Sequence, residues 1–281
     1  MSLRTSTATV LGATLALLVL IAGQKGIFGF SPRTMQGAPA SLNSPGGITR
    51  QESTPVLVEL FTSEGCSSCP PADALLSRLG RTQPVHGADI IVLEEHVDYW
   101  DRLGWKDPFS SEAATARQSE YGQAFGGREV YTPQMIVDGH AEFVGSSDND
   151  AVRAIRAASQ APKPEIQLSW ETGDTLSIHI EPLNNSGQGD GQQLFLVVAE
   201  NMLHSDVKRG ENAGRALEHN GVVRQLVPIG KIDGASAGFS SNVAVHSARE
   251  WNRANLHAVV FVQERRSRRV LAAAAISFPK V

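Results

Sequence analysis

The stretch that decides the fold is ELFTSEGCSSCPPAD, Glu59–Asp73, which holds the only two cysteines of the chain, Cys66 and Cys69. The residues just before it, VLVELF at 56–61, form a continuous apolar run that predicts a strand buried on both faces. Two prolines follow the second cysteine and suit the first turn of a helix, where a missing N–H costs nothing. Apolar residues at helical spacing then continue to Gly80. The predicted order is strand, Cys-x-x-Cys, helix.

Alternating helix and strand patterns continue for about a hundred residues, a usual size for one domain. The run IIVL predicts a second buried strand, and a hairpin is expected around the turn Asp138-Gly139. Asp148 or Asn149 is expected to cap the last helix. Further elements are expected at 90–93 (strand), 112–125 (helix), 135–137 and 141–144 (hairpin strands), and 150–159 (helix). The order βαβαββα follows for residues 55–161.

The pattern of the sequence changes at Ala161-Pro162-Lys163-Pro164, which we expect to be a domain boundary. Short apolar or alternating runs then lie between Gly, Asn and Asp turns, and they indicate a second, smaller all-β domain at 165–281, sandwich-like in architecture. Five strands are expected there, at 166–170, 175–180, 193–199, 222–226 and 256–263.

Length and composition agree with two globular domains behind a targeting segment. The chain has 281 residues, of which 41% are hydrophobic and 19% charged. Those proportions are typical of an ordinary globular protein. The formal net charge of −4 argues against a nucleic-acid-binding protein.

The N-terminus predicts export. An apolar run at Val10–Gly23 is shorter than the roughly 20 residues that span a bilayer, which favours a cleaved signal peptide. The small-x-small cleavage candidate at Ala38–Ala40 lies well beyond that run, so an uncleaved anchor stays open as an alternative. Residues 1–30 are therefore expected to be a signal peptide or anchor, and 31–54 a flexible tether rich in Ser, Pro, Gly and Thr. The expected location is periplasmic or secreted, with inner-membrane anchoring as the alternative.

The spacing of the two cysteines favours a reactive disulfide over a structural one. Structural disulfides of exported proteins usually close long loops, whereas a ring this short stabilises little. Cys66 lies just before the helix, whose N-terminus lowers a thiol pKa, so we predict that it is the nucleophile. Cys69, one turn later, is then predicted to resolve mixed disulfides. The Ser67-Ser68 pair between them leaves the redox direction open.

Four stretches carry a resemblance to a known family. They are ELFTSEGCSSCPPAD (59–73), HVDYWDRLGWKDPF (96–109), YTPQMIVDG (131–139) and VKRGENAGRALEHNGVVRQL (207–226). With these the chain resembles domain-of-unknown-function family 1223, which consists of exported, thioredoxin-like proteins. The resemblance implies the fold class: an α/β thioredoxin-like domain followed by a smaller all-β, sandwich-like domain. It implies no established substrate.

The thioredoxin resemblance also implies roles for further residues. A cis-proline lies opposite the cysteines in that fold, and Thr132-Pro133 is at the matching place, where the backbone of Thr132 would pair with an extended substrate. Thioredoxins also carry a buried acid on the strand before the cysteines, and Glu59 resembles it as a proton-transfer group. Its spacing is one residue longer, which leaves the direction of the side chain open. The alternative for Glu59 is a buried acid paired for structural reasons.

The leading functional prediction is an exported thiol-disulfide oxidoreductase that acts on protein or small thiols with a redox partner protein and needs no cofactor beyond the disulfide. A second hypothesis is a periplasmic copper-binding protein with Cys66, Cys69 and His96 as ligands. A non-catalytic interaction protein and an inert local disulfide also stay open as hypotheses. An acidic cluster around His96 could line the active-site rim, but a solvated loop is the expectation we favour there; the cluster comprises Glu94, Glu95, Asp98 and Asp101.

Overall fold

The structure is a computed structural model that describes residues 53–183, 191–232 and 238–280. The predicted signal peptide or anchor at 1–30 and nearly all of the predicted tether at 31–54 lie outside these residues. Within the described part of the chain, no helix has the length and apolar character that crossing a membrane requires.

The first half of the chain contains the seven elements predicted for it. Strand β1 leads into the cysteine motif, and helix α1 follows that motif. The final helix starts slightly earlier than predicted: its N-cap is Ser147, so Asp148 and Asn149 lie inside the helix. The elements are β1 (Thr54–Thr62), α1 (Pro70–Thr82), β2 (Ala88–His96), α2 (Glu112–Ala124), β3 (Gln134–Val137), β4 (Ala141–Val144) and α3 (Asp148–Ala158), with a 3-10 turn η1 (Asp101–Leu103).

The second half is made of strands, as expected, but it has four more of them than the patterns predicted. The five expected strands are β5 (Ile166–Trp170), β6 (Thr175–Ile180), β7 (Gln192–Glu200), β10 (Val222–Ile232) and β12 (Leu256–Glu264). The four additional strands are β8 (Leu203–Asp206), β9 (Ala216–His219), β11 (Phe239–Ala244) and β13 (Val270–Ser277), and a 3-10 turn η2 (Arg253–Asn255) precedes β12.

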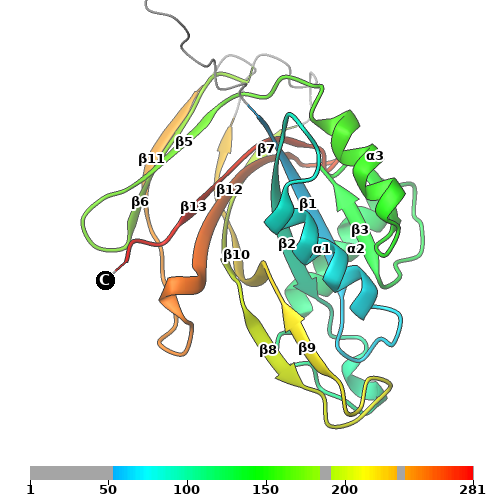
Figure 1. Cartoon of the computed structure of the whole chain (residues 1–281). Coiled ribbons are helices and arrows are strands. Elements are labelled where there is room, and N and C mark those ends of the chain that lie inside the picture. The colour runs from blue at the N-terminus through cyan, green and yellow to red at the C-terminus, as the bar shows by residue number, and fades with distance from the viewer. Residues whose placement is uncertain (1–52, 184–190, 233–237, 281) are drawn as a thin grey trace, which may run out of the picture. The chain divides into compact units, whose positions relative to one another are not determined.

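The predicted fold class, a thioredoxin-like α/β domain followed by a separate small all-β domain, is wrong. Strands from both halves join in one mixed eight-stranded sheet with the order β13-β12-β7-β10-β2-β1-β3-β4 (Figure 1). The remaining strands form a three-stranded sheet, β11-β6-β5, and a two-stranded hairpin, β8-β9. The described residues belong to one compact unit, and the expected boundary at Ala161–Pro164 is a connection between α3 and β5 within it.

The joint between the two halves is a short parallel contact of β10 with β2. Val222 pairs with Glu94, and the Glu94 N–H donates to the carbonyl of Gly221 at 2.8 Å. Gly221 has φ +78°, and a Cβ there would lie 2.7 Å from the carbonyl oxygen of Val92. Only glycine fits both the left-handed conformation and this close approach. The sequence patterns did not predict that β2 pairs with β10, because two strands more than a hundred residues apart leave no local signal of their pairing.

The eight-stranded sheet curls so far that β13 contacts β1 and β2. The Val270 N–H donates to the Asp138 carbonyl at 2.8 Å, which ties the start of β13 to the β3–β4 turn. Side chains on the inner face form one core that draws on β1, β2, β7, β12 and β13: Leu57, Ile91, Leu93, Phe195, Val197, Ala199, Val259, Phe261, Val270 and Ala273. Both halves of the sequence therefore contribute to a single hydrophobic interior.

The alternation along β1 decides which helices cover which face. Val56, Val58 and Leu60 pack against α1 and α3, whereas Phe61 packs on the other face with Tyr121 of α2. Further along the outer face, β7 and β12 pack against the three-stranded sheet. The cysteine motif at the end of β1 therefore lies on the α1 side of the sheet.

A fragment that ends at Lys163 tests this single-unit fold. Without β10, β7 and β12, strand β2 becomes an open edge and the inner faces of Leu57, Ile91 and Leu93 meet water, so we expect no cooperative unfolding transition. Thermal denaturation followed by circular dichroism measures this, with the chain from Ser53 to the C-terminus as the control. A cooperative melt of the fragment near the midpoint of the control would contradict the fold described above.

Candidate functional site

Cys66 and Cys69 are bonded to each other in a disulfide at the start of α1. Cys69 is the N-cap residue of the helix, and its carbonyl accepts from the N–H groups of Ala72 and Asp73 at 2.8 and 3.1 Å. Both cysteines are fully buried, while Ser67 and Ser68 between them are exposed. The motif therefore presents its serines to solvent and keeps its sulfurs below the surface.

A loop from the second half of the chain covers the motif. It runs from 207 to 215 between β8 and β9, and its Asn212 is fully buried. The Asn212 side-chain amide donates to the carbonyls of Glu64 and Cys66 at 2.8 and 2.9 Å, and the Ser67 N–H donates to Glu211 at 3.1 Å. Because both sulfurs are buried, a thiol can reach them only after a local movement, and we infer that this cover loop, residues 207–215, is the segment that moves.

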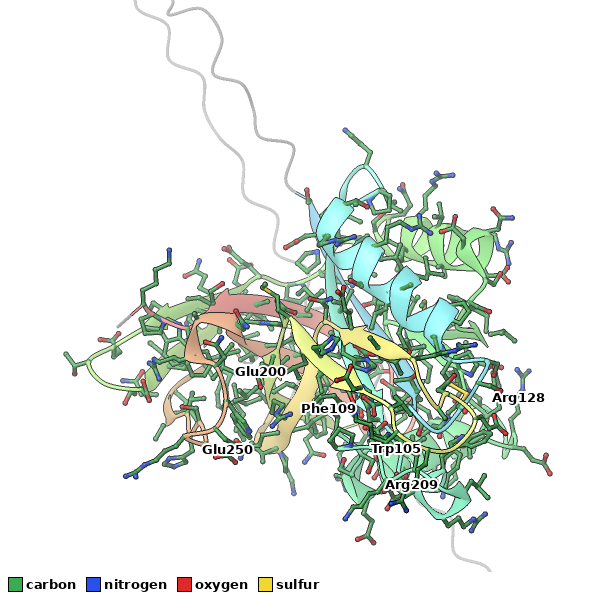
Figure 2. All side chains as sticks on the ribbon, turned by 60° about the horizontal axis from the view of Figure 1, so that its bottom comes forward. Trp105, Phe109, Arg128, Glu200, Arg209 and Glu250 are labelled. Atoms are coloured by element: carbon green, nitrogen blue, oxygen red, sulfur yellow. A yellow bond between two sulfur atoms is a disulfide. The ribbon has the colours of Figure 1, made fainter. Side chains whose placement is uncertain are left out.

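An aromatic residue supports the cover loop from below. Trp105 packs against Gly210, where an added Cβ would lie 3.1 Å from the Cβ of the tryptophan, and its indole N–H donates to Glu64 at 2.7 Å. Figure 2 shows Trp105 and Arg209 close together beside the β8-β9 hairpin. The first half of the chain thus supplies the platform on which the loop lies.

The structure brings Thr132-Pro133 to the cysteine motif. The peptide bond between them is cis, and Pro133 is buried. A side-chain carbon at Gly145 would meet both Pro133 and Ala72 of α1 at 3.2 Å, so the proline lies beside the first turn of that helix. The Thr132 hydroxyl accepts from the indole N–H of Trp100 at 2.8 Å.

Glu59 is not brought to the cysteines. It lies on the sheet face opposite α1, fully buried, where it pairs with the guanidinium of Arg117 at 2.5 Å and accepts from the hydroxyl of Tyr121. Arg117 also contacts Glu95 at 3.1 Å and Gln263 of β12 at 3.2 Å. The longer spacing noted in the sequence has a direct consequence: one extra residue turns a strand side chain to the other face.

The α1 face instead carries a cluster of buried acids and histidines beneath the disulfide. Glu94 and His96, two residues apart on β2, point to this face together, and β9 adds His219. All three are buried, and so is Glu95 on the opposite face, so the favoured expectation of a solvated loop is wrong for Glu94, Glu95 and His96 of β2. The buried cluster comprises Glu64, Asp73, Glu94, His96, Asp107 and His219.

Hydrogen bonds inside the cluster fix both imidazole rings. His96 Nδ1 bonds Asp107 at 2.7 Å, and His219 Nε2 bonds Glu64 at 3.2 Å. His219 Nδ1 lies 2.7 Å from Glu94 Oε1. His96 Nε2 is 3.5 Å from the same oxygen and makes no hydrogen bond, although the side chain is fully buried.

The charges of the cluster shift the pKa values of its members. Burial opposes the charged form of His96, but Asp107 outweighs it and raises the pKa to about 9; for His219, Glu94 and Glu64 likewise outweigh burial and raise the pKa to about 11. Burial works to raise the pKa of Glu94, yet the two histidines lower it to about 2. Burial, with the nearby charge of Glu94, raises the pKa of Asp73 to about 7.

Asp73 is the carboxyl on the helix that carries the disulfide. It comes four residues after Cys69, hence on the same helix face, and its Oδ1 accepts from the Thr62 hydroxyl at 2.6 Å. No pattern in the sequence singled out Asp73, Glu64 or Asp107. A signal for Asp73 was available, because an acid four residues after the second cysteine lies on the cysteine side of the helix.

The copper site considered from the sequence required Cys66, Cys69 and His96 together. Here the two sulfurs are bonded to each other. Among the described residues, the group of three possible metal ligands whose donor atoms all lie within 4.8 Å of one another is Glu94, His96 and His219. No pattern could have identified this group, because His219 is more than a hundred residues from its partners.

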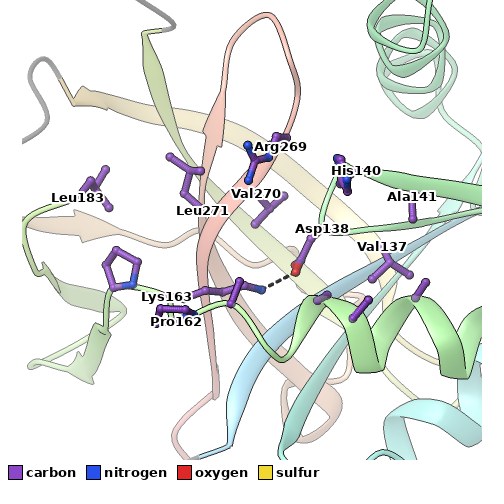
Figure 3. A pocket seen from close by; sticks show the side chains of 15 residues that line it. Val137, Asp138, His140, Ala141, Pro162, Lys163, Leu183, Arg269, Val270 and Leu271 are labelled. Carbon is purple, nitrogen blue, oxygen red and sulfur yellow. Dashed lines mark hydrogen bonds and ion pairs between the residues drawn. The ribbon is translucent and has the colours of Figure 1, made fainter. Parts of the chain in front are cut away.

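A hollow of about 320 Å³ lies away from the cysteine motif, between α3, the α3–β5 connection and β13. Alanines line much of it, and Lys163 crosses to Asp138 at 2.5 Å, as the dashed line in Figure 3 shows. Neither the cysteines nor the buried cluster contribute to its lining.

Comparisons with known proteins agree with the sequence resemblance. Residues 57–263 match a family described as proteins of unknown function, DUF1223. The chain belongs to the DUF1223 family. No curated protein matches this DUF1223 chain.

Two solved structures share the fold of this DUF1223 chain. The crystal structure of protein AGR_C_4864 from Agrobacterium tumefaciens is 25% identical, with a TM-score of 0.65 over 82% of this chain and 97% of that one. HBP35 of Porphyromonas gingivalis is 13% identical, with a TM-score of 0.58 over 82% of this chain and 77% of that one. The second likeness concerns the fold alone.

Arg117 is the residue whose loss should most disturb the inner face of the DUF1223 sheet. Arg117→Met leaves Glu59 and Glu95 buried without their cation, so we expect the free energy of unfolding to fall by about 3–5 kcal/mol in urea denaturation. The matched control is Arg128→Met, which removes the 67% exposed partner of Glu142 and should cost about 1 kcal/mol or less. Equal losses for both variants would show that the buried pair is not structurally important.

Asn212 tests whether the cover loop protects the disulfide. Asn212→Ala removes two hydrogen bonds to the motif, together about 1–2 kcal/mol, which corresponds to reduction of the disulfide by dithiothreitol that is roughly five- to thirtyfold faster. Thiol labelling followed by mass spectrometry measures the rate. Asn149→Ala, an exposed change on α3, is the control. An unchanged rate in Asn212→Ala would mean that the loop does not control access.

Proposed function

We propose that the chain is an exported thiol-disulfide oxidoreductase whose reacting group is the Cys66–Cys69 disulfide. One observation carries the proposal: the two cysteines of the chain are bonded to each other at the N-terminus of α1, directly after β1. Unpaired backbone N–H groups and the helix dipole at this position stabilise a thiolate, which is the reactive form in exchange. A disulfide that closes so short a ring contributes little to stability.

The exchange begins with the oxidised protein. A substrate thiolate attacks Sγ of Cys66, the Cys66–Cys69 bond breaks, and Cys69 leaves as a thiolate that takes up a proton. A second substrate thiolate then attacks the substrate sulfur of the mixed disulfide and releases Cys66. The substrate dithiol has lost two electrons and becomes a disulfide, and the protein holds two thiols. Reoxidation needs a second disulfide, from a partner protein or a small molecule, and the same steps run in reverse.

Neighbouring groups supply what this exchange requires. Asp73, four residues after Cys69 on the same helix face, is the carboxyl we assign to proton exchange with that cysteine. Thr132, beside the cis proline and the first turn of α1, offers backbone groups to an extended substrate chain. The cover loop sets the access of substrates. Protein thiols or small thiols of an oxidising compartment are the substrate class that fits the predicted export.

Cysteine variants separate the roles of the two sulfurs. The probe is a peptide joined to glutathione by a disulfide bond. The Cys69→Ser protein should form a mixed disulfide with it through Cys66, and this adduct should accumulate because no resolving thiol remains. Cys66→Ser should accumulate at least tenfold less, since Cys69 is the N-cap residue of α1 whereas Cys66 lies in the loop before the helix. Intact-mass spectrometry counts the adduct, and the double Cys→Ser variant is the control. If the Asn212→Ala protein, with its cover loosened, shows no exchange with either thiols or disulfides, the oxidoreductase proposal fails.

A further inference from the structure

The buried cluster contains a set of donor atoms that the exchange chemistry does not use. Glu94 Oε1 lies 2.7 Å from His219 Nδ1 and 3.5 Å from His96 Nε2, and one possible ligand atom from each of the three residues lies within 4.8 Å of the other two. Their side chains are at most 1% exposed. Three ligands at about 2.0–2.2 Å around a tetrahedral zinc ion lie roughly 3.3 Å apart, so the observed separations are within a small rotation of that geometry.

The second nitrogen of each ring is already held by a carboxylate. Asp107 binds His96 Nδ1 at 2.7 Å, and Glu64 binds His219 Nε2 at 3.2 Å. Metal-binding histidines characteristically have this arrangement, because the carboxylate fixes the ring and makes the opposite nitrogen a better ligand. In this chain both histidines have it, and in both the remaining nitrogen faces Glu94.

His96 Nε2 is the observation that points to a missing ligand. It is fully buried, makes no hydrogen bond and is aimed at Glu94 Oε1, 3.5 Å away. A buried polar atom without a partner is rare in folded proteins, and each instance calls for a ligand or another explanation. A cation placed between the three donor atoms would satisfy it.

We propose that Glu94, His96 and His219 form a binding site for a divalent transition-metal ion, with zinc as the ion that the ligand set fits best. Two imidazoles and one carboxylate are a borderline donor set that zinc uses in sites with an open fourth position. The strong thiolate preference of Cu(I) is not met, because no sulfur belongs to the set. The site shares only His96 with the copper site considered from the sequence.

The surroundings give the site a dry wall and a route of entry. The ring of Phe109 lies edge-on to both imidazoles, with centroid distances of 5.4 Å to His96 and 5.5 Å to His219. Phe109 also lines a hollow of about 720 Å³, where the guanidinium of Arg224 stacks on it at 5.6 Å. Figure 2 shows Phe109 near the middle of the molecule. Phe109 thus lies between the two imidazoles and this hollow, which is the direction from which an ion would enter.

Zinc binding by the oxidised full-length protein tests the proposal. After treatment with a chelator and its removal, equilibrium dialysis with Zn²⁺ and elemental analysis should give one zinc per chain. The Cys66→Ser/Cys69→Ser protein should bind equally, because the site contains no sulfur, so this result is independent of the proposed exchange activity. With Co²⁺ as a second probe, we expect visible d–d bands without the intense near-ultraviolet band of cobalt–thiolate ligation.

Ligand variants locate the ion. His96→Ala and His219→Ala should each weaken Zn²⁺ binding at least a hundredfold, and Glu94→Gln at least tenfold, while His204→Ala, an exposed change on β8, should leave it unchanged. Circular dichroism confirms that each variant is folded. Should a ligand variant not fold, the Co²⁺ spectrum of the unaltered protein still decides. The absence of stoichiometric binding, a thiolate band, or binding that persists in folded His96→Ala and His219→Ala proteins would each overturn the proposal.

Discussion

The hydrogen bond from the Glu94 N–H to the Gly221 carbonyl is the contact on which the rest of the structure depends. It marks the place where β10 joins β2 and turns two runs of strands into one sheet. The same joint brings His219, two residues before Gly221, against Glu94, and it directs the β8-β9 hairpin over the cysteine motif. The fold and the cover of the disulfide therefore have a common origin, which explains the need for glycine at 221.

Buried charged side chains are paired differently on the two faces of the sheet. On the inner face Arg117 places one permanent cation among Glu59, Glu95 and the hydroxyl of Tyr121, and the rings of Phe195 and Phe261 flank its guanidinium. This arrangement is saturated with hydrogen bonds and serves structure. On the α1 face four acids share two histidines, and one imidazole nitrogen makes no hydrogen bond. Because buried polar groups are costly when unpaired, the second arrangement is the one that suggests function.

Local patterns were enough to predict the seven elements of the first half of the chain, whereas the cis proline at Thr132-Pro133 was implied by the thioredoxin resemblance. They could do so because strands, caps and turns depend on neighbours in sequence. The predicted fold class was wrong because β2 pairs with β10, and this pairing joins the two halves of the chain in one sheet. Glu59 shows the same limit on a smaller scale: its burial could be expected, but its face follows from strand register, and Arg117 comes from a helix far along the chain.

The position of the buried cluster relative to the disulfide matters for how the site can work. Glu64 lies two residues before Cys66, and its carbonyl shares the Asn212 amide with that of Cys66, while its carboxylate holds His219. Glu64 is therefore the one residue through which a change in the charge of the cluster would reach the backbone next to Cys66. Movement of the cover loop would break the hydrogen bonds of Asn212 to the carbonyls of Glu64 and Cys66. Glu64 is thus the residue that connects the cover loop and the histidines to the segment that carries Cys66.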